Sequence, residues 1–239
     1  MNAADDHSKP WETTRRGLLL LVSSPAGAGK TSLTRRLVAD HSDLTLSISA
    51  TTRAARPGEE EGREYYFKTR AEFEAMIEAG EFLEWAVVNG NYYGTLQTTV
   101  MTALEGGHDV LFDIDWQGAA QIAAKAPEDS VRLFILPPAW DDLERRLRAR
   151  AQDTEETIRA RLELGREEIL HWANYDYVIV NKNFDRAYAD LGHIYRAERM
   201  KPGRNSWLPG FVEDLLADAA GGAQAVEPPK SPLLRPVQK

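Results

Sequence analysis

The sequence predicts an α/β fold in which a parallel five-stranded sheet is covered by helices on both faces. Two observations support this prediction. Five short apolar runs have the length of buried strands, and helical patterns lie between most of them, as in parallel sheets. The runs are Leu18–Ser23, Leu44–Ile48, Val110–Ile114, Val131–Leu136 and Tyr177–Val180. The helical patterns are Lys30–Ala39, Ala71–Ala79, Leu96–Leu104, Ala119–Lys125, Trp140–Arg150, Thr154–Leu170 and Asp185–Met200.

Composition narrows the class of protein. The 239 residues include no cysteine, so a disulfide framework, a Cys-based zinc site and a thiol nucleophile are excluded. Hydrophobic residues at 43% and charged residues at 28% indicate a folded globular chain. The net charge of −8 disfavours a protein that coats nucleic acid, but it allows a local basic pocket for a small anion. We expect a cytoplasmic protein that acts without nucleic acid or membrane.

Four segments interrupt or flank the alternation of strands and helices. Residues 1–16 are polar and predict a mobile arm. Residues 49–97 contain turn signals and clustered aromatic residues, which predict a small inserted subdomain, and residues 141–166 predict an arginine-rich helical hairpin. From about Pro202 the chain is rich in Gly and Pro, so we expect a disordered tail after a short helix near Phe211–Ala219.

The pair Arg15-Arg16 before the apolar run Leu18–Val22 imitates a twin-arginine export signal. The apolar core of a signal peptide usually has about 7–15 residues, which is longer than this run. A buried first strand explains the same residues better.

A glycine-rich segment between the first strand and the first helix predicts a phosphate-binding loop. Its glycines let backbone N–H groups turn toward phosphate oxygens at a helix N-terminus. Lys30 would contact the β- and γ-phosphates of a nucleotide, and the Thr31 hydroxyl would bind Mg²⁺. Ser24 occupies the first position of the motif, where glycine is usual, but the following proline favours the extended backbone there. The residues expected to bind the nucleotide phosphates are Pro25, Ala26, Gly27, Ala28, Gly29, Lys30, Thr31 and Ser32.

Asp113 ends an apolar strand and is the second candidate for the metal site. Ligands of open α/β sheets bind at the carboxyl ends of the strands, so Asp113 should lie near the phosphate loop and hold Mg²⁺ directly or through water. The alternative, an aspartate that caps the next helix, is equally compatible with the residues alone.

Separated motifs in residues 49–97 indicate what receives the phosphoryl group. They are Ser49-Ala50-Thr51-Thr52-Arg53-Ala54-Ala55-Arg56-Pro57-Gly58, Gly62-Arg63-Glu64-Tyr65-Tyr66-Phe67, Glu81-Phe82-Leu83-Glu84-Trp85 and Gly90-Asn91-Tyr92-Tyr93-Gly94-Thr95. With the phosphate loop, they make the chain resemble guanylate kinase from about Gly17 to Arg199. The resemblance implies a P-loop nucleoside-monophosphate-kinase fold with a GMP-binding insert and a helical lid. It also implies transfer of the γ-phosphoryl group of ATP to GMP, and to dGMP, in purine nucleotide metabolism.

The same resemblance implies roles for individual residues. The residues implied to bind the phosphate of GMP are Arg53, Arg56, Tyr65 and Tyr93. Those implied to recognise its guanine base are Ser49, Glu84 and Thr95. In the segment Asp113-Ile114-Asp115-Trp116-Gln117-Gly118, Asp113 is implied near the metal and Asp115 near the base or ribose. The implied catalytic residues are Lys30 and the lid arginines Arg146, Arg150 and Arg161. Asn181 is implied near the adenine. The departures from the family are Ser24, Ala151 in place of a common glycine, and the extra tail.

Physical reasoning supports a guanine site beside the resemblance. Guanine presents two adjacent N–H donors and an O6 acceptor. The carboxylate of Glu84 can accept from both donors, while Ser49 or Thr95 can donate to O6. A site of buried hydrogen-bonding groups rejects the wrong base by about 10⁴-fold or more. Two alternatives stay open: an inactive guanylate-kinase-like module that binds proteins, and a kinase for a phosphorylated sugar.

The expected domain boundaries follow the same reasoning. A guanylate kinase-like domain covers residues 17–200, with arms at 1–16 and 201–239. Within it, the segments are the core at 17–48, 98–136 and 170–200, the GMP-binding insert at 49–97 and the lid at 137–169. The oligomeric state stays open between a monomer and a homo-oligomer.

Overall fold

The computed structural model describes residues 15–88, 90–149 and 154–219, and its central sheet has five strands in the order β2-β7-β1-β8-β9. Every pair of neighbouring strands is parallel, with Leu19 beside both Val110 and Ser130. The strands are β1 (Leu19–Ser23), β2 (Leu44–Leu46), β7 (Asp109–Asp113), β8 (Ser130–Leu136) and β9 (Tyr177–Val180). The predicted five-stranded parallel sheet is confirmed.

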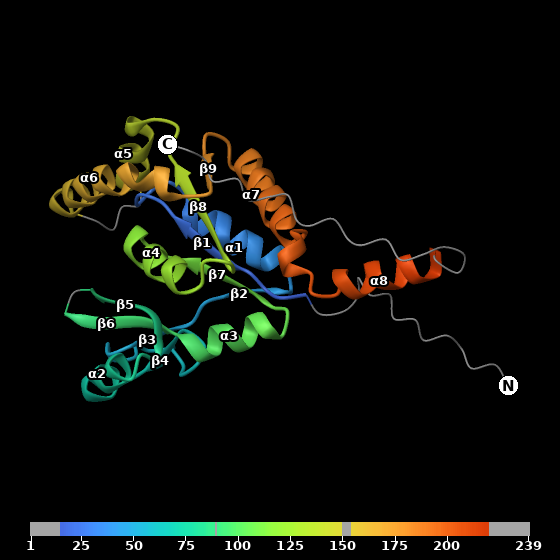
Figure 1. Ribbon diagram of the computed structural model, residues 1–239. Coiled ribbons are helices and arrows are strands. Elements are labelled where there is room, and N and C mark those ends of the chain that lie inside the picture. The colour runs from blue at the N-terminus through green and yellow to red at the C-terminus, as the bar shows by residue number, and fades with distance from the viewer. Residues whose placement is uncertain (1–14, 89, 150–153, 220–239) are drawn as a thin grey trace, which may run out of the picture.

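Helices cover both faces of this sheet (Figure 1). Alternate residues of a strand point to opposite faces. Leu20 therefore packs in one core cluster with α1 (Lys30–Asp40) and α7 (Phe184–Arg199). Leu21 packs in the other with α3 (Gln97–Glu105) and α4 (Trp116–Lys125). The fully buried β1 explains why its sequence is a continuous apolar run.

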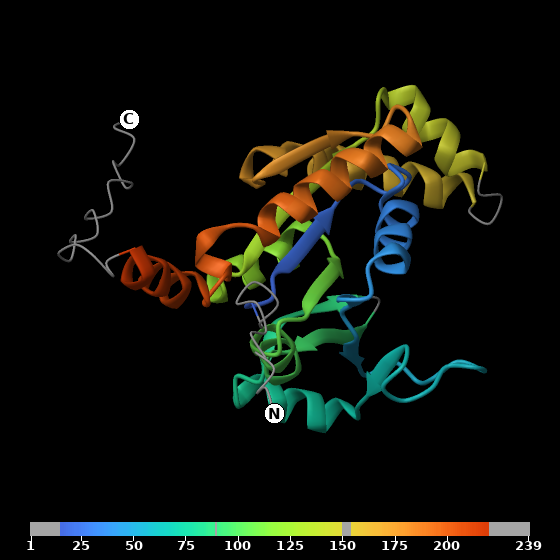
Figure 2. The same cartoon turned by 90° about the vertical axis from the view of Figure 1, so that its right-hand side faces the viewer.

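A second sheet of four strands, in the order β4-β3-β6-β5, forms the inserted subdomain (Figure 2). Its own small core contains Ala50, Phe73 and Phe82. Its elements are β3 (Ser49–Thr51), β4 (Tyr65–Phe67), α2 (Arg70–Glu78), β5 (Phe82–Val88) and β6 (Asn91–Leu96). Thr69 caps α2 and Glu72 completes a capping box, so the helix begins at Arg70. The sequence predicted the subdomain, but not its strands.

The arginine-rich hairpin consists of α5 (Trp140–Ala149) and α6 (Glu155–Ile169), followed by the 3₁₀ helix η2 (Leu170–Asn174). Three of its arginines lie in local ion pairs on the helix surfaces, and the pairs are Arg145–Asp142, Arg148–Glu144 and Arg166–Glu163. The apolar side of the hairpin enters the main core through Leu143 and Leu147. Arg150 and Ala151 lie outside the described residues.

The start of the described chain is held to the sheet rather than mobile. Arg15 forms an ion pair with Asp109, and Arg16 forms one with Asp129. The expected mobile arm therefore does not extend to residues 15 and 16, and residues 1–14 lie outside the description. Since Leu18 and β1 are buried at the centre of the fold, the apolar run is the buried strand that the sequence favoured over a signal peptide.

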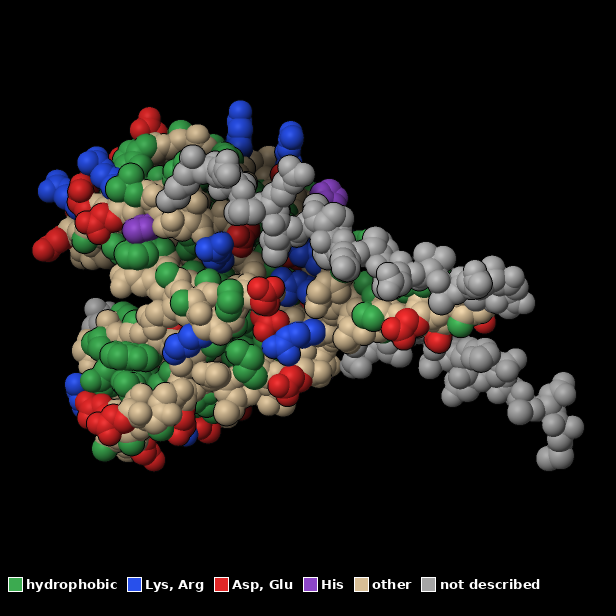
Figure 3. Space-filling view, viewed as in Figure 1, with side chains coloured by type: hydrophobic (Ala, Val, Ile, Leu, Met, Phe, Trp, Pro, Cys, Tyr) green, Lys and Arg blue, Asp and Glu red, His purple; other side chains and the backbone are tan. Residues whose placement is uncertain are grey.

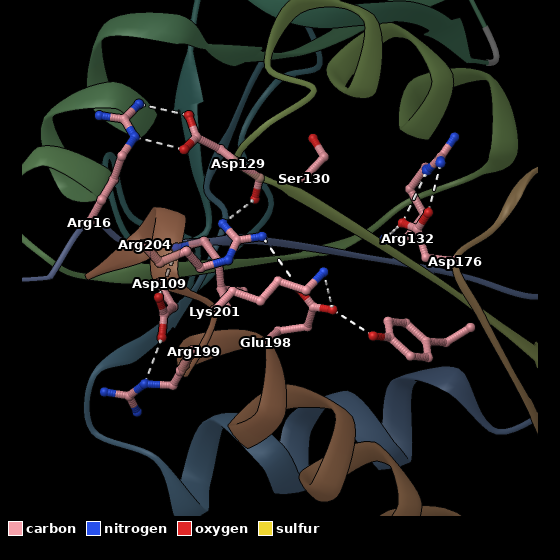
Figure 4. A network of polar contacts seen from close by, with 12 residues as sticks. Arg16, Asp109, Asp129, Ser130, Arg132, Asp176, Glu198, Arg199, Lys201 and Arg204 are labelled. Atoms are coloured by element: carbon pink, nitrogen blue, oxygen red, sulfur yellow. Dashed lines mark hydrogen bonds and ion pairs between the residues drawn. The ribbon is translucent and has the colours of Figure 1, made fainter. Parts of the chain in front are cut away.

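The chain beyond α7 continues through the 3₁₀ helix η3 (Pro202–Arg204) and α8 (Leu208–Ala219). Arg204 is buried and donates to the backbone oxygen of Asp129 and to Glu198 (Figure 4). In contrast, α8 buries none of its residues and projects from the body (Figure 1). The helix expected near the C-terminus begins three residues earlier than predicted, and residues 220–239 of the expected tail are not described. Within the described ranges, every helix is too short or too polar to cross a membrane.

Candidate active site

The segment between β1 and α1 wraps around the N-terminus of the helix, as a phosphate loop requires. Gly27 and Gly29 have φ values of 93° and 98°, a conformation that glycine adopts without strain. A Cβ at Gly29 would lie 2.4 Å from the Nδ2 atom of Asn181, so a larger residue there would displace the Asn181 amide from its bond to Ala28. Ser24 is buried and its hydroxyl donates to the oxygen of Pro25, which shows how the departure from the motif is accommodated.

Asp113 meets the two functional side chains at the start of α1. The Lys30 ammonium lies 2.7 Å from Oδ1 of Asp113, and the Thr31 hydroxyl lies 3.1 Å from Oδ2. Lys30 also donates to the backbone oxygen of Ile114. The capping alternative for Asp113 is wrong, because Asp115 caps α4 by accepting from the backbone of Gly118.

Hydroxyl and carboxylate oxygens are the ligands that Mg²⁺ prefers, and Mg²⁺ sites commonly use one or two protein ligands with waters and phosphates. The adjacent oxygens of Thr31 and Asp113 fit that chemistry. Among the described residues no group of three or more His, Cys, Asp and Glu could hold a metal alone. A metal at this place would therefore depend on the bound nucleotide for further ligands.

Two expected residues meet at the backbone oxygen of Ala28 in the phosphate loop. The amide of Asn181 donates to it at 2.8 Å, and the guanidinium of Arg146 donates to it at 3.4 Å and to the Asn181 backbone oxygen at 3.1 Å. These bonds connect the loop to β9 and to α5. Arg161 lies half-buried on α6. The hairpin therefore brings Arg146 to the phosphate loop.

Three of the residues implied for the GMP phosphate lie together in the insert. The guanidinium of Arg53 lies 5.2 Å from the centre of the Tyr65 ring, and the rings of Tyr65 and Tyr93 are 6.0 Å apart. Arg53 forms an ion pair with Glu59, which the sequence reasoning did not identify. Hydrogen bonding to that carboxylate raises the pKa of Arg53. Arg56 is exposed, and its backbone N–H donates to the same Glu59.

The guanine-reading candidates line one cavity of about 230 Å³ between the insert and the carboxyl end of the main sheet. Its lining includes Ser49, Tyr65, Glu84, Thr95 and Asp113. Strand pairing produces the juxtaposition, since Ser49 lies opposite Tyr65 and Glu84 lies opposite Thr95. The space-filling view shows the molecule hollowed between the insert and the remainder of the fold (Figure 3).

Glu84 is the buried carboxylate of this cavity. It is 8% exposed, and the hydroxyl of Thr95 donates to its Oε1 at 2.8 Å. Burial raises its pKa above the ordinary glutamate value, and the hydrogen bond from Thr95 opposes that shift. The hydroxyl hydrogen of Thr95 is therefore already engaged by Glu84.

The sequence did not predict one carboxylate near the phosphate loop, that of Glu168. Glu168, at the end of α6, has a buried Oε2 with no hydrogen-bond partner among the described residues, and burial raises its pKa. Lys30 is the nearby charge that lowers that pKa. Glu168 stands in an ordinary run of charged helical residues, so no local signal could have distinguished it.

These features define a class of protein. A phosphate loop opens α1, a second cavity with a buried carboxylate faces it, and Asp113 belongs to both, contacting Lys30 while lining the cavity. With a parallel five-stranded sheet, an insert and a helical hairpin, this is the architecture of a P-loop nucleoside monophosphate kinase.

Comparison with known proteins identifies the family. The family model described as guanylate kinase matches residues 16–198. A guanylate kinase of Caulobacter vibrioides is 55% identical over 85% of this chain and 95% of its own length. One of Maricaulis maris is 55% identical over 84% of this chain and 93% of its own. The crystal structure of guanylate kinase from Anaplasma phagocytophilum superimposes with a TM-score of 0.67 at 35% identity, covering 85% of this chain and 97% of that one. The chain belongs to the guanylate kinase family.

Proposed function

We propose that the chain transfers the γ-phosphoryl group of ATP to GMP and dGMP, giving ADP and the guanosine diphosphate. One observation carries the proposal: Asp113 lies 2.7 Å from Lys30 of the donor loop and also lines the cavity that holds Glu84. The two pockets therefore adjoin, and a phosphoryl group can pass between them. The names of the relatives support the same reaction, and nothing favours the alternative of an inactive binding module.

The donor pocket consists of the phosphate loop and the residues around it. The backbone N–H groups from Pro25 to Ser32 would surround the triphosphate, with Lys30 against the transferred group. Thr31 and Asp113 would hold Mg²⁺, which supplies charge neutralisation on the phosphates when bound. The family resemblance implies that Asn181 would lie near the adenine, and its side chain also contacts the phosphate loop at Ala28.

The acceptor pocket consists of the insert and the end of the main sheet. Arg53, Arg56, Tyr65 and Tyr93 would bind the GMP phosphate, because planar guanidinium groups supply paired donors to an oxyanion and tyrosine adds neutral ones. Arg53 would exchange Glu59 for the phosphate. Glu84 would accept from the two guanine donors, Ser49 would donate to O6, and Asp115 would lie near the base or ribose.

The chain needs no general base for this transfer. The acceptor phosphate is already largely ionised near neutrality, because the second pKa of a phosphate monoester is about 6. Lys30 and the lid arginines Arg146, Arg150 and Arg161 would neutralise charge on the transferred group. Closure of the insert and the lid over both nucleotides would exclude water, which would otherwise consume ATP.

The proposed division into core, insert and lid accompanies this reaction, and kinetics test the reaction itself and the role of Glu84. A coupled assay with ATP should show rapid turnover with GMP and dGMP, and little with AMP or ribose phosphates. Glu84→Ala should lose the preference for guanine while its thermal midpoint stays close to wild type. Absence of turnover with GMP would contradict the reaction, and an unchanged preference in Glu84→Ala would contradict the role of that residue. A cytoplasmic location and action without nucleic acid or membrane stay predictions.

A further inference from the structure

Helix α4 connects the two pockets of the site. It begins directly after Asp113 and Asp115, the latter being its N-cap, and it runs beside β5, the strand that carries Glu84. The strand β5 is an outer strand of the insert sheet, with β6 as its single neighbour there. The outer side of such a strand leaves backbone N–H and C=O groups without strand partners.

Two side chains of α4 bind backbone groups of β5. The ammonium of Lys125 donates to the backbone oxygen of Phe82 at 2.6 Å. The amide of Gln121 makes two bonds with Trp85, accepting from its N–H at 3.2 Å and donating to its oxygen at 3.3 Å. We call these three hydrogen bonds the α4–β5 contact. It fixes the strand on both sides of Glu84, two residues before it and one residue after it.

A register irregularity in β5 explains why this fixation matters. Phe82 pairs with Leu96 and Glu84 with Thr95, so Leu83 is an extra residue in the ladder. Three successive side chains then go to three places. Phe82 enters the core of the insert, Leu83 enters the core cluster that α3 and α4 form with the main sheet, and Glu84 enters the cavity. An irregular strand has fewer ladder bonds to define its backbone, so outside contacts gain importance.

We propose that Gln121 and Lys125 are positioning residues for guanine selection, because the α4–β5 contact holds the peptide groups around Glu84 and so aims its carboxylate at the base. This proposal rests on the proposed role of Glu84. Neither side chain touches the nucleotide; both act through β5. Glu84 and the phosphate-loop side of the site are thereby connected through one rigid helix, since α4 starts at Asp115.

Electrostatics favours the same role for Lys125. Burial is the largest influence on the pKa of Glu84, followed by the hydrogen bond from Thr95 and by the charges of Asp115 at the start of α4 and Lys125 at its end. Asp115 raises the pKa of Glu84, while Lys125 and Thr95 lower it. Lys125 therefore opposes the cost of burying the charged form that accepts the guanine hydrogens.

The test compares Gln121→Ala, Lys125→Met and the double variant with wild type, using GMP, IMP and ATP kinetics. IMP lacks the 2-amino donor, so the ratio of kcat/KM for GMP to that for IMP measures how well Glu84 is aimed. We expect each single variant to raise the KM for GMP about tenfold and to reduce the GMP-to-IMP ratio. The kcat and the KM for ATP should stay within about threefold of wild type, as misplacement of one reader predicts. Lys125→Arg should restore much of the loss.

Lys201→Met is the matched control, because it removes a lysine that forms a 2.7 Å ion pair with Glu198 at the opposite end of the sheet. It should leave the GMP-to-IMP ratio unchanged. An unchanged ratio in both Gln121→Ala and Lys125→Met would overturn the proposal, as would an equal rise in the KM for ATP. Thermal midpoints of all variants separate misplacement from unfolding.

Glu84→Ala distinguishes failure of this inference from failure of the proposed function. If Glu84→Ala keeps its preference for GMP over IMP, both the role of Glu84 and the positioning inference are wrong, whereas the proposed reaction falls only if the wild-type chain shows no turnover with GMP. If Glu84→Ala loses the preference while the α4 variants keep it, the positioning role alone is wrong. In the Glu84→Ala background, Lys125→Met should cause no further loss of selectivity.

Discussion

The hydroxyl of Thr95 donates a 2.8 Å hydrogen bond to Oε1 of Glu84, its cross-strand neighbour in the insert sheet. This bond orients a carboxylate that is 8% exposed and leaves its remaining acceptor capacity for a ligand. It also explains how a buried acid can keep a preferred direction before any base is bound. The first two predictions follow from this pair.

Glu84→Gln should reduce kcat/KM for GMP by about 100-fold, because a hydrogen bond to a charged group contributes about 1.5–3 kcal/mol and the amide N–H₂ would oppose a guanine donor. The relative activity with AMP should rise. A spectrophotometric assay with both acceptors measures the effect. Glu81→Gln is the control, since Glu81 is exposed outside the cavity and its loss should change neither substrate. Equal losses in the two variants would refute a special role for Glu84.

Stability should depend on pH through Glu84. Burial raises the pKa of its carboxyl above the ordinary value of 4.5. A folded-state pKa above the unfolded one means that the native chain binds the proton more tightly, so the contribution is complete below pH 4.5 and is lost as pH rises through the folded pKa. Thermal unfolding should therefore show Glu84→Gln gaining stability relative to wild type from pH 5 to pH 8. A difference that is constant with pH would contradict this account.

Gly29→Ala should be more harmful than Gly80→Ala, although both glycines have positive φ values of 98° and 70°. The backbone strain in each costs about 1–2 kcal/mol. A Cβ at Gly80 meets nothing within 4 Å, whereas one at Gly29 would clash with Asn181 at 2.4 Å. We expect Gly29→Ala to lower the thermal midpoint further and to raise the KM for ATP. A similar midpoint for the two variants would show that the loop can move away.

Thr31→Ala should increase the Mg²⁺ concentration needed for half-maximal activity, because the hydroxyl next to Asp113 is lost as a ligand. Thr31→Ser keeps the hydroxyl and should behave almost as wild type. Activity measured across a magnesium titration at saturating ATP gives the answer. If Thr31→Ala and Thr31→Ser shift the titration equally, the hydroxyl does not hold the metal.

Removal of α8 should leave the kinase intact. None of its residues is buried, and it lies beyond the family match, which ends at residue 198. A chain that ends at Asn205 should keep its kcat and its thermal midpoint.

Arg204→Ala in the full chain provides the contrast. It should destabilise the fold by about 1–3 kcal/mol, because it removes a buried partner of Glu198 and of the Asp129 backbone. A large loss of stability in the chain ending at Asn205 would show that α8 packs on the body after all.

Local patterns predicted the phosphate loop and the strands of the main sheet well. Gly29, Lys30 and Thr31 are consecutive residues at the start of α1, so a short sequence motif suffices to identify the loop. The apolar strands could be recognised because both faces of the sheet are covered. The boundaries of the helices differed by a few residues, as at α4, which begins at Trp116 instead of Ala119 because Asp115 is the cap.

The insert could not be predicted in the same detail. Strands β3 and β4 have three residues each, too few for a period-two pattern to be recognised. They are defined by pairing with distant segments, and Thr51 lies opposite Tyr93. Glu59 as the partner of Arg53, and the capping role of Asp115, also depend on how loops fold back in space.

By itself, the sequence determined the reaction chemistry of this protein: a triphosphate loop, a purine monophosphate pocket and the residue types that each requires. The tertiary structure decided which side chains enter the cavity and what holds the strand that carries them. Glu84 differs from Glu81 because the irregular β5 sends Glu84 inward, and Gln121 and Lys125 bind that strand from a separate helix. The physical reason is the separation along the sequence of the residues that interact. A phosphate-binding loop is formed by consecutive residues, whereas the orientation of a buried carboxylate depends on contacts between residues that are far apart in the sequence.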